Sequence, residues 1–303
     1  MRIGASLTSS FSIKDPRTGA RFMIERARAA RDAGLDSLFV GDHHGTPGFY
    51  YQNVPILGRL LAEWSDAPAG CLFLLPLWNP VLVAEQVGTL AAIAKGRFIF
   101  QCGLGEDAGQ FASMAADLKL RPSTFEEAFL AVQKLLRGET VSGIRRFNFG
   151  ETRLALRPTE PVEYWIGASA EPAIDRAARI GDGWLAAPSI TPDEARARIG
   201  YYKQRCAAHG RTPAAIAIRR DIYVGESDGE AASTAKPILE GGHRGFRPGV
   251  LVIGGVKKVI EDFRALGAIG YTDIIIRHIG VDHAKVLGSY ARLREVREAL
   301  KDV

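Results

Sequence analysis

The residues that could do chemistry stand out first in the stretch DSLFVGDHHG, residues 36–45, where an apolar run ends on an acid, two histidines and a glycine. A histidine can exchange a proton near neutral pH, and a neighbouring carboxylate can orient it. Asp42 and His43 are therefore candidate catalytic residues, with His43 exchanging the proton. The alternative is an ordinary strand-end turn in which the carboxylate only satisfies a hydrogen bond.

The elements that must position these residues repeat along the chain. Short β-rich runs such as RIGASL, DSLFVG, GCLFLLP and GRFIFQCG are each followed by a segment of helical periodicity. We count eight such strands and eight helices. Alternation implies a parallel sheet with right-handed crossovers, and eight units form a (β/α)8 TIM barrel. We predict a single domain over residues 1–303.

Two insertions depart from this alternation. Residues 138–160, after strand four, indicate a small β excursion, and residues 226–250, after strand seven, a long Gly-rich loop that would act as a lid. A doubly wound sheet is the competing architecture, but it needs a glycine fingerprint in the first βα turn. The chain has LTSSFSIKDPRTG there, and its near match, GLGEDAG, lies after strand four.

Composition and charge narrow the class of protein. The chain has 303 residues, 47% of them hydrophobic, and a net charge of +5 from scattered rather than clustered basic residues. This pattern disfavours nucleic acid as a partner. Cys71, Cys102 and Cys206 cannot all pair, which indicates buried thiols in a reducing compartment. The N-terminus lacks an apolar signal region and prolines interrupt the longest uncharged span, so we expect a cytoplasmic protein without a membrane segment.

The carboxyl-terminal ends of the predicted strands carry further candidates, because a TIM barrel takes its catalytic groups from these ends. Glu106 is a second candidate catalytic acid, or only a charge at a helix N-terminus. Arg277 would face an anionic substrate or the cofactor, or form a structural salt bridge. We expect no protein-bound metal, because no third ligand stands at a telling distance from His43 and His44.

The stretch WIGAS, which ends at Ser169, precedes a helix that begins near Glu171. Gly167 and Ala168 leave backbone N–H groups uncovered, and the Ser169 hydroxyl adds a donor, so this turn could receive a phosphate group. The alternative is an ordinary helix start with Ser169 as the N-cap and Pro172 in the first turn.

Three blocks of the sequence resemble a known family. They are GDHH after strand two, GCLFLLPLWNPVLVAEQVGTLAAIAKGRFIFQCGLGE across strands three and four, and YWIGASAEPAIDRAARIGDGWL around strands five and six. On these blocks the chain is similar to the bacterial luciferase-like superfamily of flavin- or deazaflavin-dependent oxidoreductases, the luciferase-like monooxygenase family. The resemblance covers nearly the whole chain.

The resemblance implies roles for particular residues. Asp42 and His43 would lie beside the isoalloxazine ring, and a strained non-prolyl cis peptide at Leu72 and Phe73 would lie behind it. The strand that ends at Gly167 would hold the cofactor phosphate. The expected cofactor-binding residues are Ser6, Leu72, Phe73, Asn79, Gly103, Gly105, Gly167, Ala168 and Ser169. The expected substrate pocket comprises His44, Tyr50, Tyr51, Trp78 and Arg277, although its aromatic members could equally form a dimer contact or loop packing.

The leading functional hypothesis is a flavin-dependent monooxygenase that oxidises a small organic substrate with reduced FMN and dioxygen. A separate reductase would supply the reduced FMN, and a homodimer is expected from the family. The first alternative is a dehydrogenase or reductase that uses the deazaflavin coenzyme F420, and GLGE with Glu106 resembles that branch. The second alternative is a non-catalytic flavin-binding protein on the same barrel.

Overall fold

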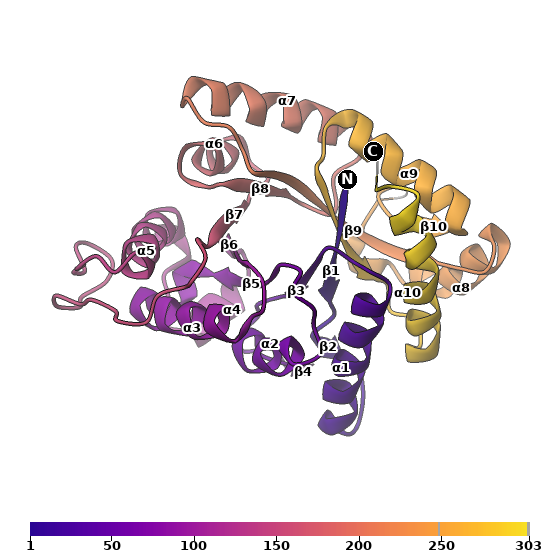
Figure 1. The fold of residues 1–303 in the computed structure, drawn as a ribbon, viewed down its shortest axis with the longest axis horizontal. Helices are drawn as coiled ribbons and strands as arrows, with labels where there is room; N and C mark the ends of the chain where they lie inside the picture. The colour runs from indigo at the N-terminus through magenta and orange to yellow at the C-terminus, as the bar shows by residue number, and fades with distance from the viewer. Residues whose placement is uncertain (248, 302–303) are drawn as a thin grey trace. The chain divides into compact units, whose positions relative to one another are not determined.

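Strands and helices alternate along the chain in the computed structural model, which describes residues 1–247 and 249–301 (Figure 1). The contacts between residues group the chain into two compact units. Unit 1 comprises residues 1–8, 21–39 and 165–303, and unit 2 comprises residues 9–20 and 40–164.

Unit 1 contains a row of parallel strands. β7 pairs with β8, β8 with β9, β9 with β11 and β11 with β1. β3 lies next to β1, and the short β10 pairs with the end of β9. These strands are almost continuously buried, which is typical of parallel sheets covered on both faces. They are β1 (Arg2–Leu7), β3 (Ser37–Val40), β7 (Glu163–Gly167), β8 (Gly183–Ala186), β9 (Ala215–Val224), β10 (Val252–Gly254) and β11 (Asp273–His278).

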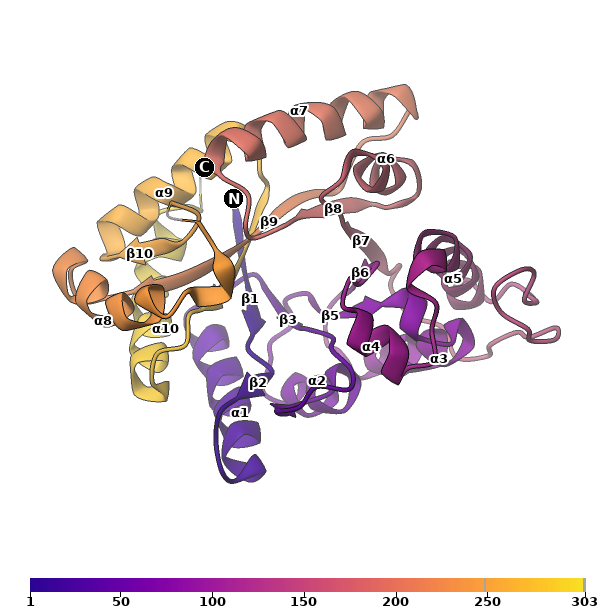
Figure 2. The same cartoon turned by 180° about the vertical axis from the view of Figure 1, so that it is seen from behind.

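Helices follow one another along the outside of this row of strands (Figures 1 and 2). α6 packs against α7, α7 against α9, and α9 against α10. Trp165, Trp184 and Tyr202 are among the largest side chains buried beneath them. The helices are α1 (Pro16–Asp32), α6 (Glu171–Ile180), α7 (Pro192–Ala208), α8 (Asp228–Glu240), the 3-10 turn η3 (His243–Gly245), α9 (Val256–Ile269) and α10 (His283–Glu298).

Unit 2 contains two parallel strands, β5 (Ala69–Leu74) and β6 (Phe98–Gly103), which pair in register along their whole length. Three helices pack together beside them, α3 contacting both α2 and α5. The antiparallel pair β2 (Ser10–Phe11) and β4 (Phe49–Tyr50) was not predicted. The helical elements are α2 (Asn53–Leu61), η1 (Leu75–Leu77), α3 (Pro80–Ile93), α4 (Ala108–Ser113), η2 (Leu118–Leu120) and α5 (Arg121–Leu136).

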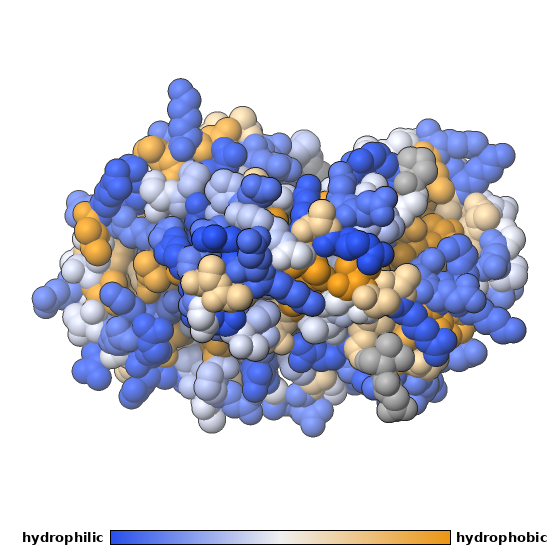
Figure 3. Space-filling view, turned by 90° about the horizontal axis from the view of Figure 1, so that it is seen from above, coloured by the Kyte–Doolittle hydropathy of each residue, from blue (hydrophilic) through white to orange (hydrophobic). Residues whose placement is uncertain are grey.

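The succession of elements confirms the predicted fold class. β1, β3, β5, β6, β7, β8, β9 and β11 are each followed by a helix, which is the order of a (β/α)8 TIM barrel. On the face drawn in Figure 3, hydrophilic residues form most of the surface and apolar residues appear as smaller patches among them. Within the described residues, no helix is both long enough and apolar enough to cross a membrane.

The prediction that residues 226–250 form a Gly-rich loop is wrong. α8 fills the first half of this segment, and β10 follows it as an additional strand. The Ser227 hydroxyl accepts the N–H of Glu230 and starts α8, and Ala231 and Ala235 bury one face of the helix against Tyr223. Among the described residues between α8 and β10, the short 3-10 turn η3 is the one helical element.

The predicted β excursion at residues 138–160 is reduced to a single antiparallel bridge between Val141 and Thr152. A carboxylate on α5 orders its tip instead. Glu127 accepts the backbone N–H groups of four consecutive residues, 144–147, at 2.9 to 3.4 Å. Burial alone would raise the pKa of Glu127, but these donors lower it below its usual range. Glu127 therefore holds this loop in place.

We expect Glu127→Gln to reduce the free energy of unfolding by about 1–2 kcal/mol, because a neutral amide accepts these N–H groups less strongly than a carboxylate. Urea unfolding would measure the loss, and amide hydrogen exchange should rise at residues 144–147. The matched control is Glu151→Gln, which changes an exposed carboxylate. Unchanged exchange at residues 144–147 would contradict this role for Glu127.

Candidate active site

Asp42 comes two residues after the end of β3 and is almost completely buried, with 1% of its surface exposed. Its Oδ2 accepts hydrogen bonds from the backbone N–H of Leu74 at 2.7 Å and from Nε1–H of Trp78 at 2.8 Å. Its Oδ1 lies 3.1 Å from Nε2 of His44. Within unit 2 the carboxylate therefore holds the end of β5 and the Trp78 ring, and it pairs with His44 rather than with His43.

His43 points away from this buried pair, and its ring is exposed. Gln110 on α4 contacts both histidines: its Oε1 accepts the backbone N–H of His44 at 3.0 Å, and its Nε2 lies 2.9 Å from Nδ1 of His43. The ring of Tyr50 packs edge-on against His43 at a centroid distance of 5.2 Å. The predicted residues His43 and Tyr50 thus meet, and Gln110, which the sequence did not single out, joins His43 to His44.

The Gln110 contacts determine the tautomer of His43. A backbone N–H can only donate, so the atom of Gln110 that meets His44 must be the amide oxygen. The amide nitrogen then faces His43, and Nδ1 of His43 must accept. A neutral His43 therefore carries its proton on Nε2, and a proton on Nδ1 would break the contact with Gln110.

Local features of the chain bring α4 to the histidines. The Asp107 carboxylate accepts the N–H of Gln110 at 2.8 Å and starts the helix. Gly45 has a φ of +58°, and a Cβ on it would lie 2.6 Å from Oγ of Ser113. Only glycine suits both the left-handed turn and this close approach. The glycine that ends the GDHHG stretch therefore allows α4 to pack over the histidines.

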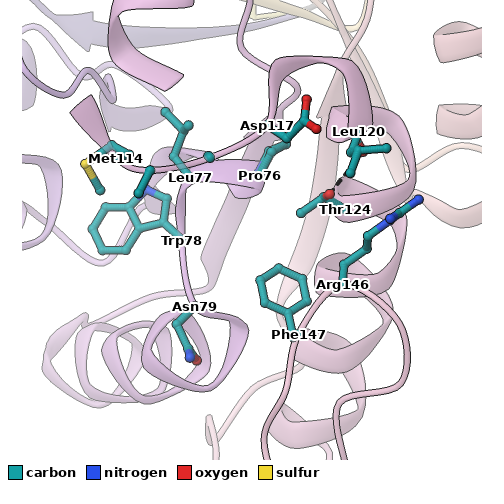
Figure 4. Close-up of a pocket in the computed structure, with 12 residues that line it drawn as sticks. Pro76, Leu77, Trp78, Asn79, Met114, Asp117, Leu120, Thr124, Arg146 and Phe147 are labelled. Carbon is teal, nitrogen blue, oxygen red and sulfur yellow. Dashed lines mark hydrogen bonds between the residues drawn. The ribbon is translucent and has the colours of Figure 1, made fainter. Parts of the chain in front are cut away.

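Trp78 connects the Asp42 site to a cavity of about 320 Å³ (Figure 4). Its indole N–H binds Asp42, and its ring packs edge-on against His44 and Phe73. The opposite wall carries Arg146 and Phe147 from the loop that Glu127 orders. The cavity is lined by Pro76, Leu77, Trp78, Asn79, Met114, Ala115, Ala116, Asp117, Leu120, Thr124, Arg146 and Phe147. It mixes apolar and polar groups, as small-molecule sites do.

Several predicted site residues have structural roles instead. The Phe73 side chain is fully buried and stacks on Phe100, because Leu72 and Phe73 alternate between the two faces of β5. The Asn79 side chain caps α3 by accepting the N–H groups of Val81 and Leu82. These contacts are structural, and a cofactor contact from Phe73 or Asn79 stays a prediction.

Tyr51 and Glu106 also make contacts, or lack them, in ways that differ from their predicted roles. The Tyr51 hydroxyl donates to the carbonyl of Pro16, and its ring packs against Phe11, so the alternative of loop packing applies. Glu106 is exposed just before the N-cap Asp107 and makes no hydrogen bond or ion pair with any described residue. The structure does not bring Glu106 to Asp42 or His43.

The expected cis peptide at Leu72 and Phe73 is wrong, since the described residues contain no cis peptide bond. β5 keeps its regular pairing through this point, with Leu72 opposite Gln101 and Phe73 opposite Cys102. The carbonyl of Leu72 also accepts Nδ2–H of Asn53 at 2.7 Å. Leu72 and Gly103 share one face of the strand pair, because a Cβ on Gly103 would contact the Leu72 side chain.

In unit 1 the structure joins two other predicted residues. Nη2 of Arg277 donates to Oγ of Ser6 at 2.6 Å. The turn after β7 begins α6 with Ala170, not Ser169, as the N-cap, and no side chain caps this helix. The alternative that Ser169 is the cap is therefore wrong. The phosphate role of Gly167, Ala168 and Ser169 stays a prediction, and Glu171 in the first turn would oppose an anion there.

The sequence analysis missed a charged cluster on β9. Asp221 is 1% exposed and accepts from Nε–H of Arg219 at 3.1 Å and from His243 at 3.0 Å. Burial by itself would raise the pKa of Asp221, but the His243 hydrogen bond and the charges of Arg219, Arg277 and Arg244 lower it to about 2. The signal in the sequence was Arg-Arg-Asp inside an otherwise apolar strand, AIAIRRDIYV.

A lowered pKa in the folded state means that the Asp221 carboxylate stabilises the fold above its unfolded pKa of about 4, and that this stability is lost as the pH falls toward 2. We expect the free energy of unfolding of the wild type to exceed that of Asp221→Asn by about 3 kcal/mol at pH 7, and by about half as much at pH 3. Urea unfolding across this range measures the difference. Asp193→Asn, an exposed change in the same unit, is the control, and a pH-independent difference would contradict the assignment.

The residues of unit 2 fit a polar cofactor ring. Oδ1 of Asp42 and Nε2 of His44 are buried, and neither has a hydrogen-bond partner of good geometry within the described chain. Nε2 of Gln101, on the adjoining strand β6, is in the same state. Buried polar atoms are normally satisfied, so these atoms suit the N–H and carbonyl groups on the edge of a flavin or deazaflavin ring.

Comparison with known proteins shows the family of the chain and agrees with its fold. The chain belongs to the luciferase-like monooxygenase family, whose model matches residues 1–266. It is 32% identical over 166 residues to the F420-dependent glucose-6-phosphate dehydrogenase of Beutenbergia cavernae, covering 52% of this chain and 49% of the relative. The match thus spans about half the length of that relative.

Solved structures share the fold over nearly the whole chain. One is the oxygenating constituent of 3,6-diketocamphane monooxygenase of Pseudomonas putida in complex with FMN, with a TM-score of 0.85, 17% identity and coverage of 99% of this chain and 98% of that one. Another is an F420-dependent secondary alcohol dehydrogenase with an F420-acetone adduct, with a TM-score of 0.81, 16% identity and 99% coverage of both chains. At these identities the likeness shows the fold alone.

Proposed function

We propose that the protein is an oxidoreductase that uses coenzyme F420 to exchange a hydride with a small organic molecule, as a dehydrogenase or reductase. The observation that carries this proposal is the Nε2–H donor of His43, set by Gln110 beside the buried Asp42–His44 pair. The F420-dependent dehydrogenase at 32% identity supports the choice of cofactor. This was the alternative to the FMN monooxygenase in the sequence analysis.

When bound, the deazaflavin supplies or accepts the hydride. Oδ1 of Asp42, Nε2 of His44 and Nε2 of Gln101 would hold its ring through hydrogen bonds, and Leu72 and Gly103 would border it. His43 acts on the substrate: its Nε2–H donates a hydrogen bond to a carbonyl oxygen and stabilises the negative charge that develops there during reduction. Gln110 and Tyr50 hold the imidazole in position, and Trp78 provides an apolar wall beside the pair.

An FMN-dependent monooxygenase is the second candidate, and the FMN-bound neighbour with a TM-score of 0.85 favours it. A separate reductase as partner belongs to that candidate alone. The homodimer stays a prediction for both. The two candidates differ in one requirement, since only the monooxygenase consumes dioxygen.

Cofactor titration of the apoprotein tests the proposal directly. We expect F420 to bind at least tenfold more tightly than FMN, followed by absorbance and fluorescence, and Asp42→Ala to weaken F420 binding because the carboxylate contacts the ring. Turnover with F420 should persist without oxygen, and His43→Ala should lower kcat/KM by about 100-fold. Tight FMN binding with oxygen-dependent turnover would replace this proposal by the monooxygenase, and turnover that His43→Ala leaves unchanged would remove the role of His43.

Gln110→Glu tests the tautomer argument. A carboxylate at this position accepts both the His44 N–H and an Nδ1–H of His43, so it favours the imidazolium and should raise the pKa that His43 shows in the kcat/KM profile by about one unit. The His43-dependent limb of the profile therefore moves to higher pH. Gln110→Leu, which offers no polar group, should lower kcat/KM without this displacement. Superimposable profiles for wild type and Gln110→Glu would show that Gln110 does not control His43.

A further inference from the structure

Three arginines of unit 1 gather around one buried carboxylate. Nε of Arg219 lies 3.1 Å from Oδ1 of Asp221, and Nε of Arg244 lies 3.6 Å from Oδ2. The charge of Arg277 also acts on Asp221, and its guanidinium binds the Ser6 hydroxyl. The function proposed above for His43 does not involve any residue of β9 or η3.

The strand register explains why these groups share one face. Arg219 is paired with Ile275, and Asp221 with Arg277, so each pair stands side by side on neighbouring parallel strands. A Cβ on Gly4 would lie 2.8 Å from the Ile275 side chain, which places Gly4 on the same face. Side chains two residues apart point to the same side of a strand, so Ser6 joins this face from β1. Four polar side chains from three strands therefore converge.

The turn η3 covers this cluster and is conformationally strained. Arg244 has a φ of +51°, which non-glycine residues rarely adopt, between Gly242 and Gly245, both of positive φ. Two contacts hold the turn in place: Nε2 of His243 lies 3.0 Å from Asp221, and Arg247 binds Glu194 of α7 at 2.6 Å. Strain that the surroundings enforce is concentrated at functional sites. Here it directs the Arg244 guanidinium toward Asp221.

Charge distinguishes this cluster from an ordinary ion pair. The single carboxylate of Asp221 lies within the influence of three guanidinium groups, those of Arg219, Arg277 and Arg244. Burial and the nearby charges of Arg277 and Arg244 together lower the pKa of Arg219 to about 9, although Asp221 acts in the opposite direction. Like charges held together in a poorly solvated place are costly, and a second anion would relieve that cost.

We propose that Arg219, Arg244 and Arg277, with the Ser6 hydroxyl, form a binding site for an oxyanion of a small molecule, a carboxylate or a phosphate group. Guanidinium groups present paired N–H donors that match both anions. The carboxylate of Asp221 holds the arginines apart and in position, and η3 contributes the most exposed of them, since the Arg244 side chain is 42% exposed. The ligand is either a substrate that bears such a group or the phosphate of a cofactor.

Calorimetric titration of the purified apoprotein with inorganic phosphate tests the site. We expect saturable binding that Arg244→Gln weakens about tenfold, since one charged donor is lost. Arg17→Gln removes an exposed arginine of unit 2 and should leave the affinity unchanged. Arg244→Lys keeps the charge and should weaken binding less than Arg244→Gln. Because Arg244 is partly exposed, these variants should fold, which circular dichroism checks. The proposal is overturned if phosphate shows no saturable binding or if Arg244→Gln and Arg17→Gln behave alike.

Repeating the titration in the presence of F420 and of FMN distinguishes the two sources of the anion. If the apparent phosphate affinity falls as cofactor is added, the site takes the cofactor phosphate. If it stays constant, the site takes the oxyanion of a separate small molecule. Either result supports the site, and neither depends on which cofactor supports turnover, so failure of the F420 proposal leaves this test intact.

Discussion

The burial of the Asp42 carboxylate is the constraint on which the site in unit 2 depends. An ionised group this deeply buried persists only with close polar partners, and the Leu74 N–H and the Trp78 indole N–H supply them at 2.7 and 2.8 Å. Both partners lie at or just after the end of β5, so the carboxylate fixes the end of this strand. It also fixes the Trp78 ring, which forms one side of the cavity.

The two oxygens of the Asp42 carboxylate differ in how many hydrogen bonds they accept. Oδ2 has two donors, whereas Oδ1 is close to His44 Nε2 without the alignment of a hydrogen bond. A fold under no functional demand would pair such buried atoms. The natural interpretation is a site that completes its hydrogen bonds on a ligand, with Gln101 contributing a further donor. Gln110 contacts both the backbone of His44 and the ring of His43, so it stands between the buried Asp42–His44 pair and the exposed imidazole.

The sequence predicted the fold better than it predicted the roles of side chains. Strand and helix alternation is a local pattern, and the strand ends follow from it, so Asp42 and His43 could be placed in advance. Which neighbour each would contact depends on folding, and Gln110 lies 67 residues from His43. Because successive residues of a strand point to opposite faces, the sequence could have predicted that Leu72 and Phe73 would not both contact one cofactor ring. In contrast, nothing local could reveal that the Tyr51 hydroxyl binds Pro16 or that the distant residues Arg244 and Arg277 join Asp221.

The wrong prediction of a loop at residues 226–250 shows how glycine content can mislead a prediction of secondary structure. Four glycines in GESDG and EGG suggested an irregular segment, but Ser227 and Glu230 begin a helix between them, and Ala231 and Ala235 give it a buried face. The glycines then mark its boundaries. In the turn η3 that follows the helix, the non-glycine residue Arg244 takes a left-handed conformation. The strained backbone conformation in this segment therefore falls on Arg244, whose guanidinium lies beside Asp221, the carboxylate on β9.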